Sequence, residues 1–268
     1  MDADVDELVT ELRSAGCVFA EDEAQILRSR AADGEQLARW VRRRVAGEPL
    51  EHIVGIVEFA GLDLVVGPGV FIPRQRSRLL AAVASGEVRA TPDSKTPVFI
   101  EPYCGVAPLA AVVARDHPHA AVVVSDVDPV ALDYARRNVG PRARVCEGAG
   151  LSGLPSELRG GVAVIAAVPP YVPDDELDLM PGEARDHEPV ATHAGGAAGL
   201  AEVRRLIVDA AEWLAPGGVL AVEMHRDQTD EAAGLATRSG STATVVTEHP
   251  AYADDGHTAV LVMRGRSD

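Results

Sequence analysis

The chain has 268 residues, enough to bury a large hydrophobic core without disulfides or a structural metal. Its 41 acidic residues outnumber its 25 Lys and Arg residues, which gives a formal net charge of −16. Nucleic-acid affinity depends on cations that neutralise phosphates, so this charge argues against a direct nucleic-acid partner. The apolar share of 47% and the charged share of 25% exclude a disordered or fibrous chain.

We expect neither an export signal nor a membrane span. The N-terminus, Met-Asp-Ala-Asp-Val-Asp-Glu, is acidic where a signal peptide is basic, and the longest apolar runs are too short to cross a bilayer. Cys17, Cys104 and Cys146 are widely spaced and odd in number, which indicates reduced thiols and no metal-ligand pattern. The sequence therefore predicts a cytoplasmic protein with no membrane partner and no metal site.

Residues 1–48 are expected to form an N-terminal helical recognition domain. Apolar residues recur at helical spacing in three short stretches, near Leu8, Leu27 and Trp40, and glycines separate the stretches. Residues 49–73 are expected to form a hairpin linker, because the pattern changes to that of strands from Ile53 onward, on both sides of Gly61.

Residues 74–268 alternate short apolar strands with helices, which predicts an α/β domain with a doubly wound, mostly parallel sheet. Parallel strands are expected near residues 98–100, 121–125, 145, 162–167 and 219–224, with an antiparallel pair near 245–246 and 259–263. Ligands of such sheets bind at the carboxyl ends of the strands.

Two positions at that edge are candidates for binding a nucleoside. Asp126 ends the second strand, where a carboxylate can accept both hydroxyls of a ribose. The competing interpretation is a helix N-cap, although Asp128 before Pro129 already fits that role. The loop after the first strand, residues 101–107, contains a single glycine, Gly105, where nucleotide loops use several. By itself this loop does not predict a nucleotide site.

A proline-rich loop follows the fourth strand. Val168, Pro169, Pro170 and Tyr171 form a segment that is stiff before any ligand binds, and Tyr171 can stack on a planar group. A rigid structural turn with a half-buried tyrosine explains the loop equally well. His187 stands among charged residues, so it is either a general base or, more in keeping with its neighbours, part of a salt-linked surface loop.

Taken in order, these segments resemble the N5-glutamine methyltransferases that act on peptide-chain release factors, in particular a divergent branch from high-GC bacteria. The resemblance covers nearly the whole chain and rests on residues 47–55 (GEPLEHIVG), 67–74 (GPGVFIPR), 125–129 (SDVDP), 181–189 (PGEARDHEP) and 214–218 (LAPGG). The family implies a helical substrate-recognition domain, a hairpin linker and a class I methyltransferase domain that depends on S-adenosylmethionine.

The resemblance also implies a site. Asp126 would hold the ribose of S-adenosylmethionine. The other expected cofactor-binding positions are Glu101, Tyr103, Cys104, Gly105, Ala107, Val127 and Ala149. The expected catalytic loop is Val168, Pro169, Pro170 and Tyr171.

The chain departs from the family pattern at the chemically important positions. Tyr103 and Ala107 stand where the family has glycines, and we expect the Tyr103 ring to narrow or fill the methionine end of the pocket. Ala149 stands near the position of an Asp that faces the adenine. Val168 replaces the Asn that accepts a hydrogen bond from the glutamine amide, and valine has no acceptor. The chain's single asparagine, Asn138, belongs to an earlier helix and cannot replace it.

Three functions are compatible with this pattern. The first is a methyltransferase with a changed acceptor, either a small molecule or a protein. The second is an enzyme of the same fold that uses the cofactor for other chemistry, and the third is a non-catalytic binding partner. We favour the first, because Asp126, Gly105 and the proline-rich loop are retained.

Overall fold

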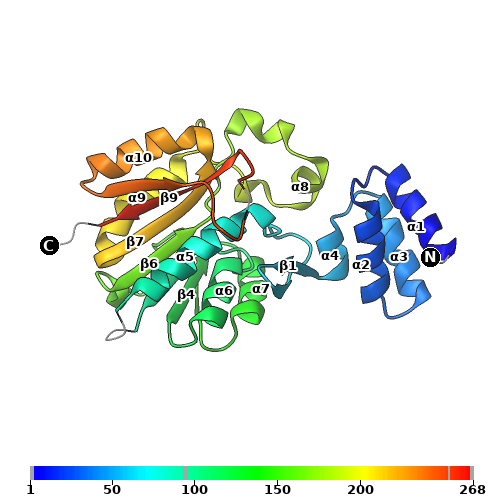
Figure 1. The fold of residues 1–268 in the computed structure, drawn as a ribbon, viewed down its shortest axis with the longest axis horizontal. Helices are drawn as coiled ribbons and strands as arrows, with labels where there is room; N and C mark the ends of the chain where they lie inside the picture. The colour runs from blue at the N-terminus through cyan, green and yellow to red at the C-terminus, as the bar shows by residue number, and fades with distance from the viewer. Residues whose placement is uncertain (1–2, 93–95, 253, 266–268) are drawn as a thin grey trace.

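The computed structural model describes residues 3–92, 96–252 and 254–265 (Figure 1). Its elements form a group of N-terminal helices, a two-stranded hairpin and an α/β part built on a seven-stranded sheet. The N-terminal helices lie at one end of the long axis, and the seven-stranded sheet with its helices occupies the rest (Figure 1). Within the described residues, no helix combines the length and the apolar character that a membrane span needs.

The N-terminal helices pack around a small core of their own. They are α1 (Ala3–Ser14), α2 (Ala20–Arg30), α3 (Gly34–Val45) and α4 (Leu50–Val54). Asp33 caps α3, since its side chain accepts a hydrogen bond from the Gln36 backbone N–H. The core residues are Leu8, Leu12, Cys17, Ala20, Ala24, Leu27, Val41 and Ile53.

The prediction that strand structure starts at Ile53 is wrong. Ile53 belongs to α4, where it is buried in the helical core, and Gly55 ends the helix at a φ of +78°. The hairpin starts one residue later, with β1 (Ile56–Phe59) pairing antiparallel with β2 (Leu62–Val65). A buried apolar residue is compatible with either period, so its burial in a helical core could not be read from the local pattern.

The predicted doubly wound sheet is confirmed. Its strands are β3 (Val98–Pro102), β4 (Ala121–Asp126), β5 (Arg144–Glu147), β6 (Val162–Ala167), β7 (Leu214–His225), β8 (Thr242–Val246) and β9 (Thr258–Arg264), in the order β5-β4-β3-β6-β7-β9-β8. Strands β3 to β7 are parallel, and β9 runs antiparallel to β7 and β8. The strand order reverses between β3 and β6, which is where ligands bind in sheets of this type.

Helices cover both faces of the sheet (Figure 1). One face carries α5 (Arg78–Ala90), α6 (Pro108–Asp116) and α7 (Pro129–Val139), and the other carries α9 (Ala201–Trp213) and α10 (Thr229–Arg238). Neighbouring residues of β3 therefore enter different cores: Phe99 packs under α5–α7 and Ile100 packs under α9. Short helices lie in the loops, namely η1 (Gln75–Ser77), η2 (Ser156–Leu158), η3 (Asp174–Leu179), α8 (Gly182–His187), η4 (Val190–Thr192) and η5 (Arg226–Gln228).

A buried arginine joins the N-terminal helices to the α/β part. Arg44 of α3 is 7% exposed and donates two hydrogen bonds to Glu23 of α2, at 2.5 and 3.0 Å. It donates a third to Glu183 of α8, at 2.7 Å. Because buried charges are costly unless paired, this arginine fixes α8 against the N-terminal helices.

We expect Arg44→Ala to lower the free energy of unfolding by about 3–5 kcal/mol, because it leaves the buried Glu23 carboxylate without its partner. The matched control is Arg39→Ala, which breaks the exposed pair with Glu35 and should cost less than about 1 kcal/mol. Urea unfolding followed by circular dichroism measures both. Equal, small losses in the two variants would contradict the structural role of Arg44.

Candidate functional site

A cavity of about 470 Å³ opens at the carboxyl ends of β3, β4 and β6. This volume lies within the range of small-molecule sites. The predicted site residues that line it are Glu101, Tyr103, Cys104, Gly105, Asp126, Val127, Val168, Pro169, Pro170 and Tyr171. The structure thus brings together side chains from three loops that are far apart in the sequence.

Glu101 fixes the start of α6. Its buried carboxylate accepts hydrogen bonds from the backbone N–H groups of Leu109, at 3.3 Å, and Ala110, at 2.6 Å. These groups lie in the first turn of the helix, which has no other acceptors for them. Burial raises the pKa of Glu101 to about 8, although the two N–H donors favour the charged form.

The loop between β3 and α6 has three residues with a positive φ, and one of them is a glycine. Tyr103, Gly105 and Ala107 have φ angles of +54°, +53° and +62°. Left-handed backbone costs a residue with a Cβ roughly 1–2 kcal/mol, so Tyr103 and Ala107 are strained where Gly105 is not. Ala107 ends this loop, is fully buried and does not line the cavity. Two residues with a Cβ, Tyr103 and Ala107, therefore adopt a backbone conformation that favours glycine.

Tyr103 forms a wall of the cavity and leaves its volume open. Its hydroxyl donates a hydrogen bond to Glu202 of α9, at 2.6 Å. The ring also lies against Gly150, where an added Cβ would come within 2.8 Å of that hydroxyl. The side chain is thus anchored at its far end, and it does not fill the space beside Gly105.

Asp126 links two loops at the end of β4. One carboxylate oxygen accepts the Gly105 N–H at 2.8 Å, and the other accepts the Asp128 N–H at 3.0 Å. Burial raises the pKa of Asp126. Asp128 itself caps α7 by accepting the Val130 N–H at 2.8 Å, so Asp126 is not the N-cap. Each Asp126 oxygen keeps lone-pair capacity for a ligand donor, and the adjacent Val127 is 60% exposed.

The proline-rich loop presents an apolar surface to the cavity. Val168 is half-buried, packs against the α5–α7 core and offers no polar side-chain atom. The Tyr171 hydroxyl donates to Glu223 of β7 at 3.2 Å and accepts from Arg76 Nε at 3.2 Å. Because Glu223 is fully buried, this network holds the Tyr171 hydroxyl in a fixed position at the cavity edge.

Several residues of the cavity were missed by sequence reasoning. One side of the cavity, which we call the loop wall, is formed by the segment before α5, the proline-rich loop and the segment after α8. Its residues are Phe71, Pro73, Val168, Pro170, Pro189, Ala191, Thr192 and His193. Of these, Val168 and Pro170 were predicted, and the other six were missed. Residues 67–74 and 181–189 both carried the family resemblance, and that signal could have drawn attention to Phe71, Pro73 and Pro189. Nothing in the local sequence singled out His193.

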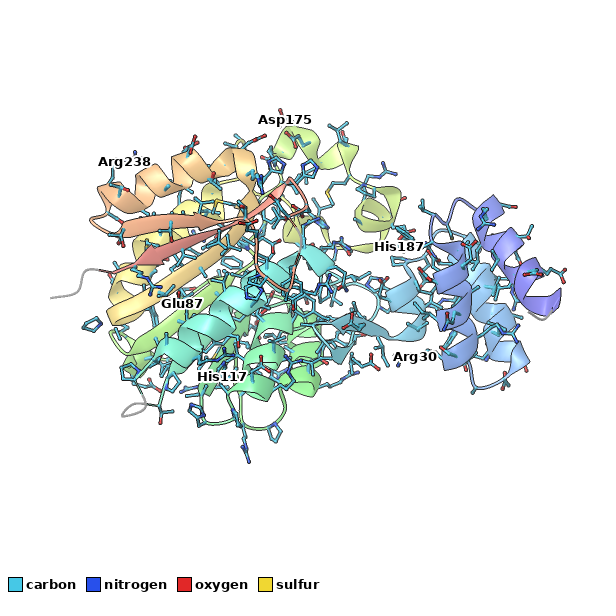
Figure 2. All side chains as sticks on the ribbon, in the orientation of Figure 1. Arg30, Glu87, His117, Asp175, His187 and Arg238 are labelled. Carbon is cyan, nitrogen blue, oxygen red and sulfur yellow. The ribbon has the colours of Figure 1, made fainter. Side chains whose placement is uncertain are left out.

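Ala149, a predicted cofactor-binding position, and His187, the candidate general base, also lie outside the cavity wall. Ala149 follows β5 in a turn closed by a hydrogen bond from Ser152, and it does not contact the cavity. His187 ends α8 at the junction with the N-terminal helices (Figure 2). The structure therefore favours the surface interpretation of His187 over a general base.

Comparison with known proteins gives consistent relatives. No family model matches the chain. It is 36% identical to the release factor glutamine methyltransferase of Streptomyces coelicolor over 215 residues, 80% of this chain and 72% of the relative. It is 35% identical to that of Mycobacterium leprae over 245 residues, 84% of this chain and 83% of the relative. It is also 34% identical over 187 residues to a 4-amino-L-phenylalanine/4-methylamino-L-phenylalanine methyltransferase of Streptomyces pristinaespiralis, 69% of this chain and 63% of that relative.

The fold is similar to that of a solved methyltransferase. The crystal structure of a methyltransferase from Pyrococcus furiosus superposes with a TM-score of 0.53 at 17% sequence identity. The match covers 87% of this chain and 98% of the other. The predicted class I methyltransferase-type fold is thereby confirmed.

We expect Glu101 to make stability fall as pH rises. Its pKa is raised from 4.5 to about 8, so the folded state keeps a proton that the unfolded state has already released. This contribution is complete below pH 4.5 and is lost as pH rises through 8. Within that window the free energy of unfolding should fall by up to about 1.4 kcal/mol per pH unit. Urea unfolding between pH 5 and pH 9 should give Glu101→Gln a flatter profile than the native protein, and parallel profiles would disprove the assignment.

Proposed function

This chain belongs to the release factor glutamine methyltransferase family, and we propose that it uses S-adenosylmethionine to methylate an acceptor other than the release-factor glutamine. The sequence-based resemblance to that family is confirmed by the two relatives at 35 and 36% identity. The observation that carries the change of acceptor is Val168, an apolar residue in the cavity wall.

The residues of the strand ends fit a nucleoside cofactor. Asp126 has free lone pairs and would accept the ribose hydroxyls, and the exposed Val127 would pack on the adenine. The left-handed backbone at Gly105 would let the cofactor approach the main chain closely. When bound, S-adenosylmethionine supplies an electrophilic methyl group.

The loop wall and the proline-rich loop support the proposed change of acceptor. Pro169 and Pro170 keep this side of the cavity rigid, and Tyr171 is tied down by Arg76 and Glu223. A rigid apolar wall excludes water from the acceptor. Val168 cannot orient a glutamine amide, and the loss of one preorganised polar contact typically costs about 2.7–4 kcal/mol in the transition state.

A change of acceptor has a precedent among the relatives. The Streptomyces pristinaespiralis relative is named for an amino group on an aromatic amino acid, whereas the others are named for the glutamine of release factors. Both named substrates, glutamine and an aromatic amine, contain a side-chain nitrogen. We therefore extend the proposal to a nitrogen nucleophile.

We expect Asp126→Ala to weaken binding of S-adenosylmethionine and of S-adenosylhomocysteine by about 1.5–3 kcal/mol, the cost of lost charge-assisted hydrogen bonds. Isothermal titration calorimetry measures both ligands. Asp133→Ala is the matched control, because Asp133 is an exposed carboxylate on α7 whose ion pair, among the residues that the structure describes, is with Arg136. Unchanged affinity in Asp126→Ala would show that Asp126 is a structural carboxylate. If neither ligand binds the native protein at millimolar concentration, only the non-catalytic interpretation survives.

We expect little or no methylation of the release-factor glutamine by the native protein, because Val168 leaves an amide N–H unpaired on burial, a penalty of about 1–3 kcal/mol. The assay is methyl transfer to purified release factors, with mass detection at the glutamine. Val168→Asn alone should restore only part of the activity, since Tyr103 and Ala107 also depart from the family pattern. Robust turnover by the native protein would overturn the proposed change of acceptor.

A further inference from the structure

A buried histidine occupies the loop wall next to the proline-rich loop. His193 is 7% exposed and lines the same cavity as Val168. Its carbonyl accepts the Val172 N–H at 2.9 Å, and the Gly195 N–H donates to the Val172 carbonyl at 2.8 Å. These backbone hydrogen bonds fix the segment of His193 against Val172, at the end of the proline-rich loop.

The carboxylate of Glu188 lies next to the imidazole of His193. Its carboxylate is fully buried and accepts hydrogen bonds from Arg74, at 2.6 Å, and from the Ile72 N–H, at 3.2 Å. His193 Nε2 lies 2.9 Å from the Glu188 Oε2 atom without the alignment of a hydrogen bond. The Phe71 ring meets the imidazole edge to face, with the ring centroids 5.5 Å apart. A carboxylate beside Nε2 favours the tautomer that carries the proton there, and Nδ1 then keeps a lone pair.

The other polar side chains of this region are already committed. The Tyr171 hydroxyl bonds to Arg76 and Glu223, and the Thr192 hydroxyl donates to the Pro189 carbonyl. Within the described part of the chain, His193 Nε2 is a buried nitrogen that faces Glu188 without an aligned hydrogen-bond partner. Because Nε2 is the buried nitrogen and His193 lines the cavity, we take Nδ1 as the atom that can accept a hydrogen bond from a ligand there, whereas Val168 of the same cavity has no acceptor.

We propose that His193 determines acceptor specificity by accepting a hydrogen bond from the N–H of an aromatic amine bound against the loop wall. This inference rests on the proposed function and names its substrate class. An arylamine donates an N–H, is uncharged at neutral pH and has a flat apolar body that suits Phe71 and the prolines. A side-chain amide would also need a donor for its carbonyl oxygen, and burying that oxygen unpaired is costly.

The test is calorimetric binding in the presence of saturating S-adenosylhomocysteine, so that no turnover occurs. The probes are 4-amino-L-phenylalanine and its near-isostere 4-methyl-L-phenylalanine, which differ in the N–H donor. The native protein should bind the amino probe roughly tenfold more tightly, the value of one hydrogen bond. His193→Leu should abolish this preference, and His193→Asn should restore it, because the Asn oxygen lies near the position of Nδ1. His119→Leu, which alters an exposed histidine, should leave the preference unchanged.

Each other outcome overturns the inference in a distinguishable way. Equal affinity of the native protein for both probes, or a preference that persists in His193→Leu, removes the role of His193. Tighter binding of N-acetylglutamine methylamide than of the amino probe excludes the arylamine class. Failure to bind S-adenosylhomocysteine defeats the proposed function itself.

A second measurement covers the case in which His193→Leu does not fold. In native protein labelled with ¹³C in its histidine rings, the His193 signal is identified by its absence in His193→Asn. It should shift when the amino probe is added and should not shift with the methyl probe. A signal that ignores both probes, while calorimetry shows that they bind, contradicts the contact.

Discussion

The carboxylates of Glu101 and Asp126 hold the loop between β3 and α6 in its shape. Glu101 binds the first turn of α6 from below, and Asp126 binds the Gly105 N–H from the neighbouring strand. Both groups are desolvated, and burial raises the pKa of each. The loop they hold has left-handed backbone at Tyr103 and Ala107, where a glycine would be unstrained. Residues of this loop, namely Tyr103, Cys104 and Gly105, line the cavity, so its shape helps to set the shape of the site.

The two sides of the cavity differ in their chemistry. At the strand ends, Asp126 and the backbone at Gly105 keep the arrangement expected for a nucleoside, and Tyr103 is anchored to Glu202 at its far end. At the loop wall, the apolar Val168 and the buried His193 line the cavity. In the proposed function the strand ends bind the cofactor and the loop wall determines the acceptor, since function depends on the site and not on the fold.

The sheet could be predicted from the sequence, because its strands are short apolar runs separated by helices and turn residues. The strand β6 was predicted with its observed bounds, Val162–Ala167, and the antiparallel pair of β8 and β9 was also found. Ile53 was misassigned, because an apolar residue next to a strand pattern can equally well close a helical core. Boundaries of this kind are decided by tertiary packing.

The site was predictable only in part, for a similar reason. Residues at strand ends, such as Asp126 and Val168, can be placed from topology, because parallel strands end at one edge. His193 reaches the cavity through backbone hydrogen bonds with Val172 and lies beside the buried Glu188, and neither contact leaves a local sequence signal. The network of Tyr171, Arg76 and Glu223 likewise joins residues from three separate segments.

The proposed function places the cofactor at the strand ends and a changed acceptor at the loop wall. The most direct test of this arrangement is a crystal structure with S-adenosylhomocysteine bound. We predict the ribose hydroxyls on Asp126, the adenine against Val127, and the sulfur facing a space bounded by Val168 and His193. Tyr103 should remain on Glu202. A structure in which the Tyr103 ring enters the cavity and the ligand is absent from Asp126, at saturating ligand, would contradict it.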